Sequence, residues 1–278
     1  MNIDNAKYLD KIEKIQKRYP YQQMPEHLKR AFEQDMRIRL SWNTNSLEGN
    51  TLSLEETVEI ISYDEVRSGH TYSEYTEAKN SYKAYQKMNF SQVQEIDLNL
   101  IRQINGIIMD SDGNFRTNQV YIGSLAEVAF LPPEPEKIEE RMENYLSSMQ
   151  MPEPTEKLQK IIQQIAKLHM EFEMIHPFRD GNGRTGRFMM NQMLLNQGIL
   201  PAIILNHSKY RQAFRIYERN GGTGLMEYCL VSGIARSYEI LEDNCVKPGD
   251  FSSFQMKNQI GSLCEKGISG LLFEKNSL

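Results

Sequence analysis

The chain of 278 residues has few cysteines and no long apolar run. Its three cysteines, Cys229, Cys245 and Cys264, are odd in number and unpatterned, so they indicate reduced thiols and neither a disulfide framework nor a zinc site. No apolar stretch reaches the length of a membrane span, and the polar N-terminus is not typical of a signal peptide. We therefore expect a cytoplasmic protein without membrane contact.

Positive charge is not in excess either. Thirty-two basic residues against 37 acidic ones give a net charge of −5, which argues against a general nucleic-acid or membrane surface. With 40% hydrophobic and 25% charged residues, the composition is that of an ordinary soluble globular protein. The length suffices for one large domain or two small ones.

Residues 175–188, with the sequence IHPFRDGNGRTGRF, lie between two helical patterns. In residues 158–175, apolar side chains recur at three- and four-residue intervals, which predicts an amphipathic or buried helix. Pro177 should end that helix and place His176 at its last turn. Helical spacing resumes at Phe188, so the segment is predicted to connect two helices.

The second half of this connector has the features of an anion site. Gly181, Gly183 and Gly186 allow backbone amides to converge at the start of the second helix, where the helix dipole favours an anion. Arg184 and Arg187 add fixed charge, and arginine is suited to two-pronged contact with phosphate oxygens. The pattern predicts a cradle for a polyphosphate.

Two further residues complete this candidate site. Asp180 suits a magnesium ion that takes one protein carboxylate and fills its other positions with phosphate oxygens and water. His176 is the candidate general base. A helix C-terminus and nearby phosphates both favour the charged imidazole, against an ordinary pKa of about 6.5. We therefore expect a rate that rises from about pH 6 to about pH 8.

Three other interpretations of the segment compete with a phosphate site. Residues 181–186 satisfy G-x-G-x-x-G, but a dinucleotide-binding turn requires a strand before it, whereas a helix is expected here. A transition-metal site could use His169, Glu171, Glu173, His176 and Asp180. These residues lack the H-E-x-x-H spacing. A solvated loop without chemistry would not need a base, a carboxylate, three glycines and two arginines together.

Residues 176–187 match every fixed position of H-x-F-x-[D/E]-G-N-G-R-x-x-R, the motif of Fic-domain proteins, which this sequence resembles over about residues 41–245. The resemblance implies an all-α fold, namely a Fic-type helical bundle with a short β-hairpin flap. It also implies an enzyme that uses ATP and Mg²⁺. Such an enzyme transfers AMP to a Ser, Thr or Tyr hydroxyl of a target protein and releases pyrophosphate.

The resemblance also implies a role for each matching residue. His176 would deprotonate the target hydroxyl, and Phe178 would anchor the loop in the core. Asp180 would hold magnesium. The phosphates would be bound by Gly181, Asn182, Gly183, Arg184 and Arg187.

A second motif lies upstream, in residues 44–57. Thr44-x-x-x-Glu48-Gly49 fits the [S/T]-x-x-x-E-[G/N] inhibitory motif that accompanies many Fic domains. The resemblance implies that Glu48 pairs with Arg187 and that Thr44 touches Asn182. A carboxylate on Arg187 would keep the γ-phosphate of ATP from seating and would misalign the α-phosphorus.

Residues 113–138 contain two short runs rich in β-branched and aromatic residues, QVYIG and EVAFL. They predict a β-hairpin, which taken alone could be purely structural. The resemblance implies a flap along which the target chain aligns as an added strand through backbone contacts. Tyr121 and Ile122 are the expected flap residues.

We expect three segments along the chain. Residues 1–40 should form helices, residues 41–245 the Fic domain with its inhibitory helix and flap, and residues 246–278 a linker and a C-terminal tail. Ser53 and Glu56 have the spacing of a capping box, so a helix should begin there.

Two alternative functions stay open. Glu48 could orient a water molecule that removes AMP from a modified protein, or the chain could be a nucleotide-sensing regulatory or toxin-like binding module. The sequence also leaves open the nucleotide base, the target protein, modification of the chain itself and assembly into a homo-oligomer.

Overall fold

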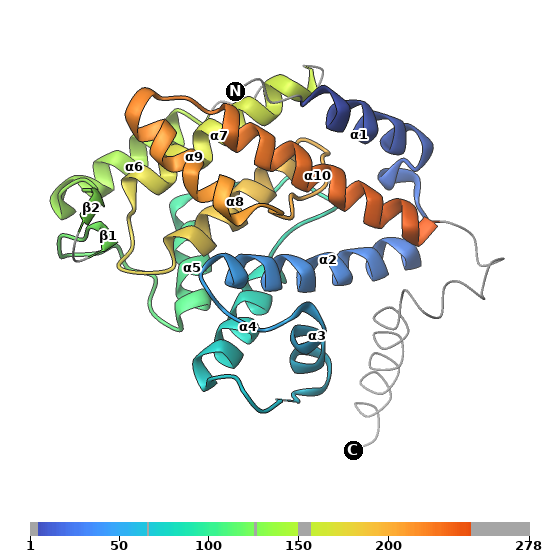
Figure 1. Ribbon diagram of the computed structural model, residues 1–278, viewed down its shortest axis with the longest axis horizontal. Coiled ribbons are helices and arrows are strands. Elements are labelled where there is room, and N and C mark those ends of the chain that lie inside the picture. Colours follow the sequence, from blue (N-terminus) through green and yellow to red (C-terminus); the bar gives the residue numbers. More distant parts are fainter. Residues whose placement is uncertain (1–4, 66, 125–126, 150–156, 246–278) are drawn as a thin grey trace.

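The computed structural model describes residues 5–65, 67–124, 127–149 and 157–245, and this part of the chain is mostly helical (Figure 1). The all-α prediction is confirmed. The expected linker and tail, with Cys264, lie outside the described residues. The helices are α1 (Ala6–Arg18), α2 (Glu26–Leu47), α3 (Leu54–Tyr63), α4 (Tyr72–Tyr85), α5 (Leu98–Met109), α6 (Ile138–Ser147), α7 (Leu158–Ile175), α8 (Asn182–Asn196), α9 (His207–Asn220) and α10 (Gly224–Cys245), with short 3-10 turns η1 (Tyr21–Gln23) and η2 (Pro135–Lys137).

Helix α8 is the centre of the bundle. It packs against α7, α5 and α2, while α10 covers α7 and carries α9 and α1 on its other sides (Figure 1). Nearly every side chain of α8 is buried, including Phe188, Met190 and Leu194. A helix that is buried on all faces fixes the position of whatever its first turn carries.

Helices α3 and α4 form a hairpin at one edge of the bundle (Figure 1). Leu52, Ile60 and Ala78 make a small core that is separate from the main one. The predicted capping box is confirmed, because Ser53 and Glu56 bond reciprocally at the start of α3. Helix α2 runs through residue 40 without interruption, so residues 26–40 share one helix with Thr44, and Glu48 is the C-cap of that helix.

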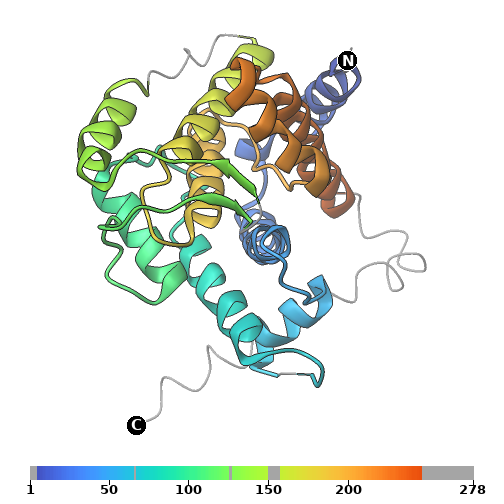
Figure 2. The ribbon, with the colours of Figure 1, turned by 60° about the vertical axis from the view of Figure 1, so that its left-hand side comes forward.

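Two short strands, β1 (Ile122–Ser124) and β2 (Glu127–Phe130), pair antiparallel within the segment expected to form a hairpin (Figure 2). The side chain of Tyr121 is exposed and that of Ile122 is half-buried. The role of this hairpin as a flap stays a prediction.

Among the described helices, each is too short or too polar to cross a bilayer.

One glycine determines how the chain leaves α5 toward the hairpin. Gly113 has a φ of +65°, and a Cβ there would lie 2.0 Å from the carbonyl oxygen of Arg102. Gly198 also has a positive φ, of +70°, but open space surrounds it.

We predict that Gly113→Ala lowers the free energy of unfolding by about 3 kcal/mol or more, because backbone strain and a clash with the main chain of α5 add up. Gly198→Ala, the matched control, should cost only about 1 kcal/mol from the left-handed backbone. Urea denaturation of both variants measures the difference. Equal losses would show that the close approach to Arg102 contributes nothing.

Candidate active site

His176 lies directly after α7, where the sequence predicts it. It adopts the left-handed conformation, with φ 50° and ψ 58°, and its N–H donates to the carbonyl of Phe172. Residues other than glycine rarely adopt this conformation, so the surroundings must hold it. Arg116 does so, because its Nε donates to the carbonyl of His176 at 2.9 Å and its backbone N–H to that of Pro177 at 2.9 Å.

The sequence did not indicate Arg116, because an arginine in a polar loop is ordinarily a surface residue. Here it is buried, and its guanidinium also donates to the carbonyls of Asn118 and Pro133. These two acceptors lie on the segments that enter and leave the hairpin. Arg116 therefore joins both ends of the hairpin to the residue that carries the candidate base.

The imidazole of His176 is neutral in this setting. Burial lowers its pKa to about 4 and the charge of Arg116 acts in the same direction, whereas the carbonyl of Glu173 and the carboxylates of Glu48 and Asp180 oppose the shift. Without phosphates the shift is opposite to the direction expected from the sequence, which counted on phosphates as well as on the helix end. Desolvation outweighs the helix terminus, and the imidazole can accept a proton well below pH 6.

The turn between α7 and α8 is held by a buried asparagine and a buried ring. The amide of Asn182 accepts from the N–H of Phe178 and donates to its carbonyl, both at 2.8 Å. The ring of Phe178 is buried and packs against Phe115 with centroids 5.4 Å apart. Gly181 has a φ of +75°, and a Cβ there would lie 2.8 Å from Met109. The turn has no space for a side chain at this position.

Arg187, in the first turns of α8, is fully engaged and only 3% exposed. Its Nε donates to the hydroxyl of Thr44 at 2.8 Å, and its Nη2 donates to the carbonyl of Thr44 at 3.1 Å and to the carboxylate of Glu48. Its Nη1 reaches the hydroxyl of Tyr210 at 3.4 Å. The structure thus contains the ion pair between Glu48 and Arg187 that the resemblance implies.

The described contact of Thr44 is with the same arginine. The hydroxyl of Thr44 accepts from Arg187, and its expected contact with Asn182 stays a prediction. The amide of Asn182 already bonds to both backbone groups of Phe178, so within the described chain its hydrogen bonds stay inside the turn. Thr44 therefore acts with Glu48 on the same guanidinium.

The carboxylate of Glu48 lies over the start of α8. A Cβ added to Gly183 would lie 2.5 Å from Oε1 of Glu48, so the bare backbone of Gly183 leaves room for this anion. Burial opposes the charge of Glu48, but the charge and hydrogen bond of Arg187, with the charge of Arg184, outweigh it and lower the pKa of the carboxyl. An anion therefore already stands where the sequence predicts a phosphate.

Arg184 is held much more loosely than Arg187, although only 7% of its side chain is exposed. Its Nη2 donates to the sulfur of Met109 at 3.2 Å, and its nearest carboxylates are those of Asp180 at 3.6 Å and Glu77 at 3.9 Å. Its Nε is buried without a hydrogen-bond partner in the described part of the chain. A buried guanidinium with an unused donor suits a phosphate oxygen.

Asp180 has the accessibility that a magnesium ligand requires, since 69% of its side chain is exposed. It follows the base by four residues and lies beside Arg184. In the described ranges, no three His, Cys, Asp or Glu side chains come together as a transition-metal site would need. The residues present thus fit a magnesium ion bound with phosphates better than a metal held by protein alone.

Gly186 allows α8 to pack closely against α7 and is not part of the predicted phosphate cradle. A Cβ there would lie 2.3 Å from Oε1 of Glu173 and 3.0 Å from the ring of Phe172, both on α7. Burial raises the pKa of Glu173 to about 8 and lowers that of His169 to about 3, so both side chains are uncharged at neutral pH. His169 bonds to the hydroxyl of Tyr210 at 2.7 Å. The close contact of α7 and α8 accounts for the glycine and for the neutral pair.

Two cavities flank the hairpin. One, of about 880 Å³, opens beside Asp180 and is lined by α5, by the loop of residues 111–120 and by Arg179. The other, of about 730 Å³, lies where the chain leaves β2 and is lined by residues 130–134, α6 and the end of α7. Both volumes are within the usual range for sites that bind small molecules.

Comparison with known proteins agrees with this geometry. Residues 95–194 match the model of the Fic/DOC family. Proteins named protein adenylyltransferase Fic are similar in sequence. The one from Drosophila melanogaster is 34% identical over 181 residues, which cover 61% of this chain and 35% of that protein. The one from Culex quinquefasciatus is 30% identical over 195 residues, which cover 66% of this chain and 37% of that protein. The chain thus spans about a third of the length of these relatives.

Solved structures share the fold. A Fic domain containing signaling protein from Bacteroides thetaiotaomicron superposes with a TM-score of 0.69 at 20% identity, over 84% of this chain and 96% of that one. Fic-1 from C. elegans superposes with a TM-score of 0.69 at 22% identity, over 86% of this chain and 71% of that one. Residues 95–194 thus match the Fic/DOC family, and the described part of the chain has the fold of solved Fic structures.

Proposed function

We propose that the chain is a protein adenylyltransferase that Glu48 keeps inactive. It transfers AMP from ATP to a hydroxyl of a target protein and releases pyrophosphate. The proposal rests on the position of the Glu48 carboxylate, which lies over Gly183 and pairs with Arg187 at the start of α8. The neutral imidazole of His176 lies beside it. The name of the relatives, protein adenylyltransferase Fic, supports the same reaction.

In this reaction a bond forms between the target oxygen and the α-phosphorus, and the bond to pyrophosphate breaks in line with it. The hydroxyl proton passes to Nε2 of His176, since Nδ1 is buried. Arg184 and Arg187 hold the outer phosphates, and the backbone from Gly181 to Gly183 contacts them at the start of α8. Asp180 would hold Mg²⁺, which would neutralise phosphate charge when bound.

Inhibition follows from competition for Arg187. Glu48, Thr44 and Tyr210 contact all three nitrogens of the guanidinium, so the γ-phosphate seats there only when the carboxylate has left. With the γ-phosphate displaced, the α-phosphorus is out of line with the attacking oxygen. Glu48 thus blocks the reaction without contacting the reacting atoms.

The target protein aligns with the hairpin in this proposal. A two-stranded sheet leaves backbone groups on its outer edges that an extended segment can pair with. Tyr121 is exposed next to β1 and offers an aromatic surface to such a segment. Backbone pairing would bring a hydroxyl toward His176, because Arg116 ties both ends of the hairpin to that residue.

Removal of AMP is the second candidate, and one observation favours it. The carboxylate of Glu48 lies close enough to the imidazole to raise the pKa of His176 against the effect of burial. A carboxylate beside a base could orient a water molecule toward a bound phosphodiester. Under this proposal Glu48→Gly abolishes removal of AMP while it enhances transfer.

We predict that Glu48→Gly raises AMP transfer by about tenfold or more, because Arg187 becomes free for the γ-phosphate. The measurement is incubation with magnesium and α-labelled ATP, followed by intact mass of the protein and by label in added target extract. Glu48→Gly/His176→Ala should show no transfer, because the base is missing.

Glu55→Gly, which removes an exposed carboxylate from α3, is the matched control and should behave as the unaltered chain. If every variant binds ATP and none transfers AMP, the donor is another nucleotide or the chain acts as a sensing module.

The second prediction concerns pH. Because the pKa of His176 is lowered to about 4, the base is neutral above that pH, and kcat/KM of Glu48→Gly should be level from about pH 6 to about pH 7.5 and fall below about pH 5. Initial rates with magnesium in excess over ATP measure the profile.

Glu173→Gln controls for the upper end of the range, since the pKa of Glu173 is raised to about 8. A rise in rate centred near pH 6.5 would contradict a desolvated imidazole and restore the expectation from sequence.

A further inference from the structure

The two arginines of α8 each face a carboxylate from a different helix. Arg187 pairs with Glu48 at the end of α2. Arg184 lies one turn earlier, and its Nη1 is 3.9 Å from Oε1 of Glu77 on α4. The side chain of Glu77 is 31% exposed, so solvent screens this second pair only in part.

The second oxygen of Glu77 holds the turn that carries Glu48. Oε2 of Glu77 accepts from Nδ2 of Asn50 at 2.9 Å, and the same nitrogen donates to the carbonyl of Glu74 at 3.1 Å. Asn50 follows Glu48 by two residues. One carboxylate therefore contacts both the arginine predicted to bind a phosphate and the turn that places the inhibitory glutamate.

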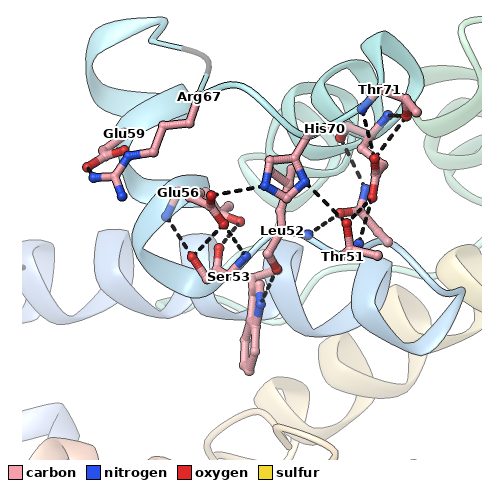
Figure 3. Close-up of polar contacts among 12 residues, drawn as sticks. Thr51, Leu52, Ser53, Glu56, Glu59, Arg67, His70 and Thr71 are labelled. Atoms are coloured by element: carbon pink, nitrogen blue, oxygen red, sulfur yellow. Dashed lines mark hydrogen bonds and ion pairs between the residues drawn. The ribbon is translucent and has the colours of Figure 1, made fainter.

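The rest of this turn is hydrogen-bonded to helices α3 and α4 (Figure 3). Thr51 donates to the carboxylate of Glu74 through its N–H at 2.8 Å and its hydroxyl at 2.6 Å. His70 bridges the hydroxyl of Thr51, at 3.2 Å, and the carboxylate of Glu56, at 2.9 Å. These polar contacts, together with the N–H of Asn50 that donates to the carbonyl of Asn45 at 3.1 Å, position the chain just after Glu48.

We propose that Glu77 is a positioning residue that competes with nucleotide phosphates for Arg184 and that couples this competition to Glu48 through Asn50. The inference rests on the proposed function, because it assigns Arg184 to an outer phosphate of ATP. A phosphate on Arg184 takes the partner of Glu77 and brings negative charge next to it. The repulsion displaces the carboxylate of Glu77, which weakens its hold on Asn50 and hence on the turn of Glu48. Because such coupling is reciprocal, release of Glu48 also makes Arg184 easier to occupy.

The test compares nucleotides with and without outer phosphates. Titration calorimetry with magnesium and either ATP or AMP is done in the Glu48→Gly/His176→Ala background, in which nothing is turned over. Glu77→Gln removes the charge that faces Arg184 and keeps an acceptor oxygen for Asn50. It should tighten ATP binding about two- to fivefold and leave AMP binding unchanged, because AMP lacks the outer phosphates.

Glu59→Gln is the matched control, since it removes one carboxylate charge on the neighbouring helix α3, where Glu59 pairs with Arg67. It should change neither affinity. Equal changes for ATP and AMP, or equal effects of Glu77→Gln and Glu59→Gln, would overturn the inference. If the background variant itself binds no ATP, the proposed function is wrong, and this inference, which rests on it, is wrong as well.

Asn50→Ala tests the coupling to Glu48. It cuts the link between Glu77 and the turn without touching Arg184. In the chain with Glu48 present it should raise AMP transfer about two- to fivefold, whereas in Glu48→Gly it should have no effect, because there is no inhibitory carboxylate left to position. An equal gain in both chains would show that Asn50 acts independently of Glu48 and would overturn the coupling.

Discussion

The ion pair between Glu48 and Arg187 is the interaction on which the rest of the site depends. Arg187 is 3% exposed, and a buried guanidinium without an anion costs several kcal/mol. In the structure that anion is the carboxylate of Glu48, supported by the hydroxyl of Thr44. The position of α2, the burial of α8 and the bare backbone of Gly183 are all arranged so that one negative group can stand at the start of α8.

The candidate base shows a second constraint, which comes from packing. His176 ends α7 in a left-handed conformation because Pro177 follows it and Arg116 binds the carbonyls of both residues. The same burial that holds the ring lowers its pKa to about 4. A neutral imidazole at physiological pH therefore follows from how tightly α7, the turn and the hairpin ends are joined, and needs no dedicated partner on the ring.

Much of the fold could be predicted from the sequence because its signals are local. Proline after His176 ends a helix, Ser53 and Glu56 open one, and glycine at 181 and 183 marks backbone without space for side chains. Other features depend on partners far apart in the chain. The direction of the His176 shift, the contact of Thr44 with Arg187, the packing role of Gly186 and the buried place of Arg116 all require tertiary neighbours that no spacing rule identifies. The pairing of Glu48 with Arg187 could be expected only from the resemblance of two motifs.

Under the proposed function, the need of Arg187 for an anion also explains how inhibition by Glu48 can be reversed. If Glu48 leaves with nothing in its place, a buried charge is uncompensated, so spontaneous release is disfavoured. A γ-phosphate that arrives as Glu48 leaves supplies the missing anion, and Arg184, with its unused donor and its loose contacts to Glu77 and Asp180, is the place where such a phosphate can first be held. In this proposal the carboxylate of Glu48 resembles the γ-phosphate in charge and position. In the same proposal, a change that weakens the turn after Glu48 shifts the exchange toward nucleotide without altering the arginines, so different residues would control regulation and binding.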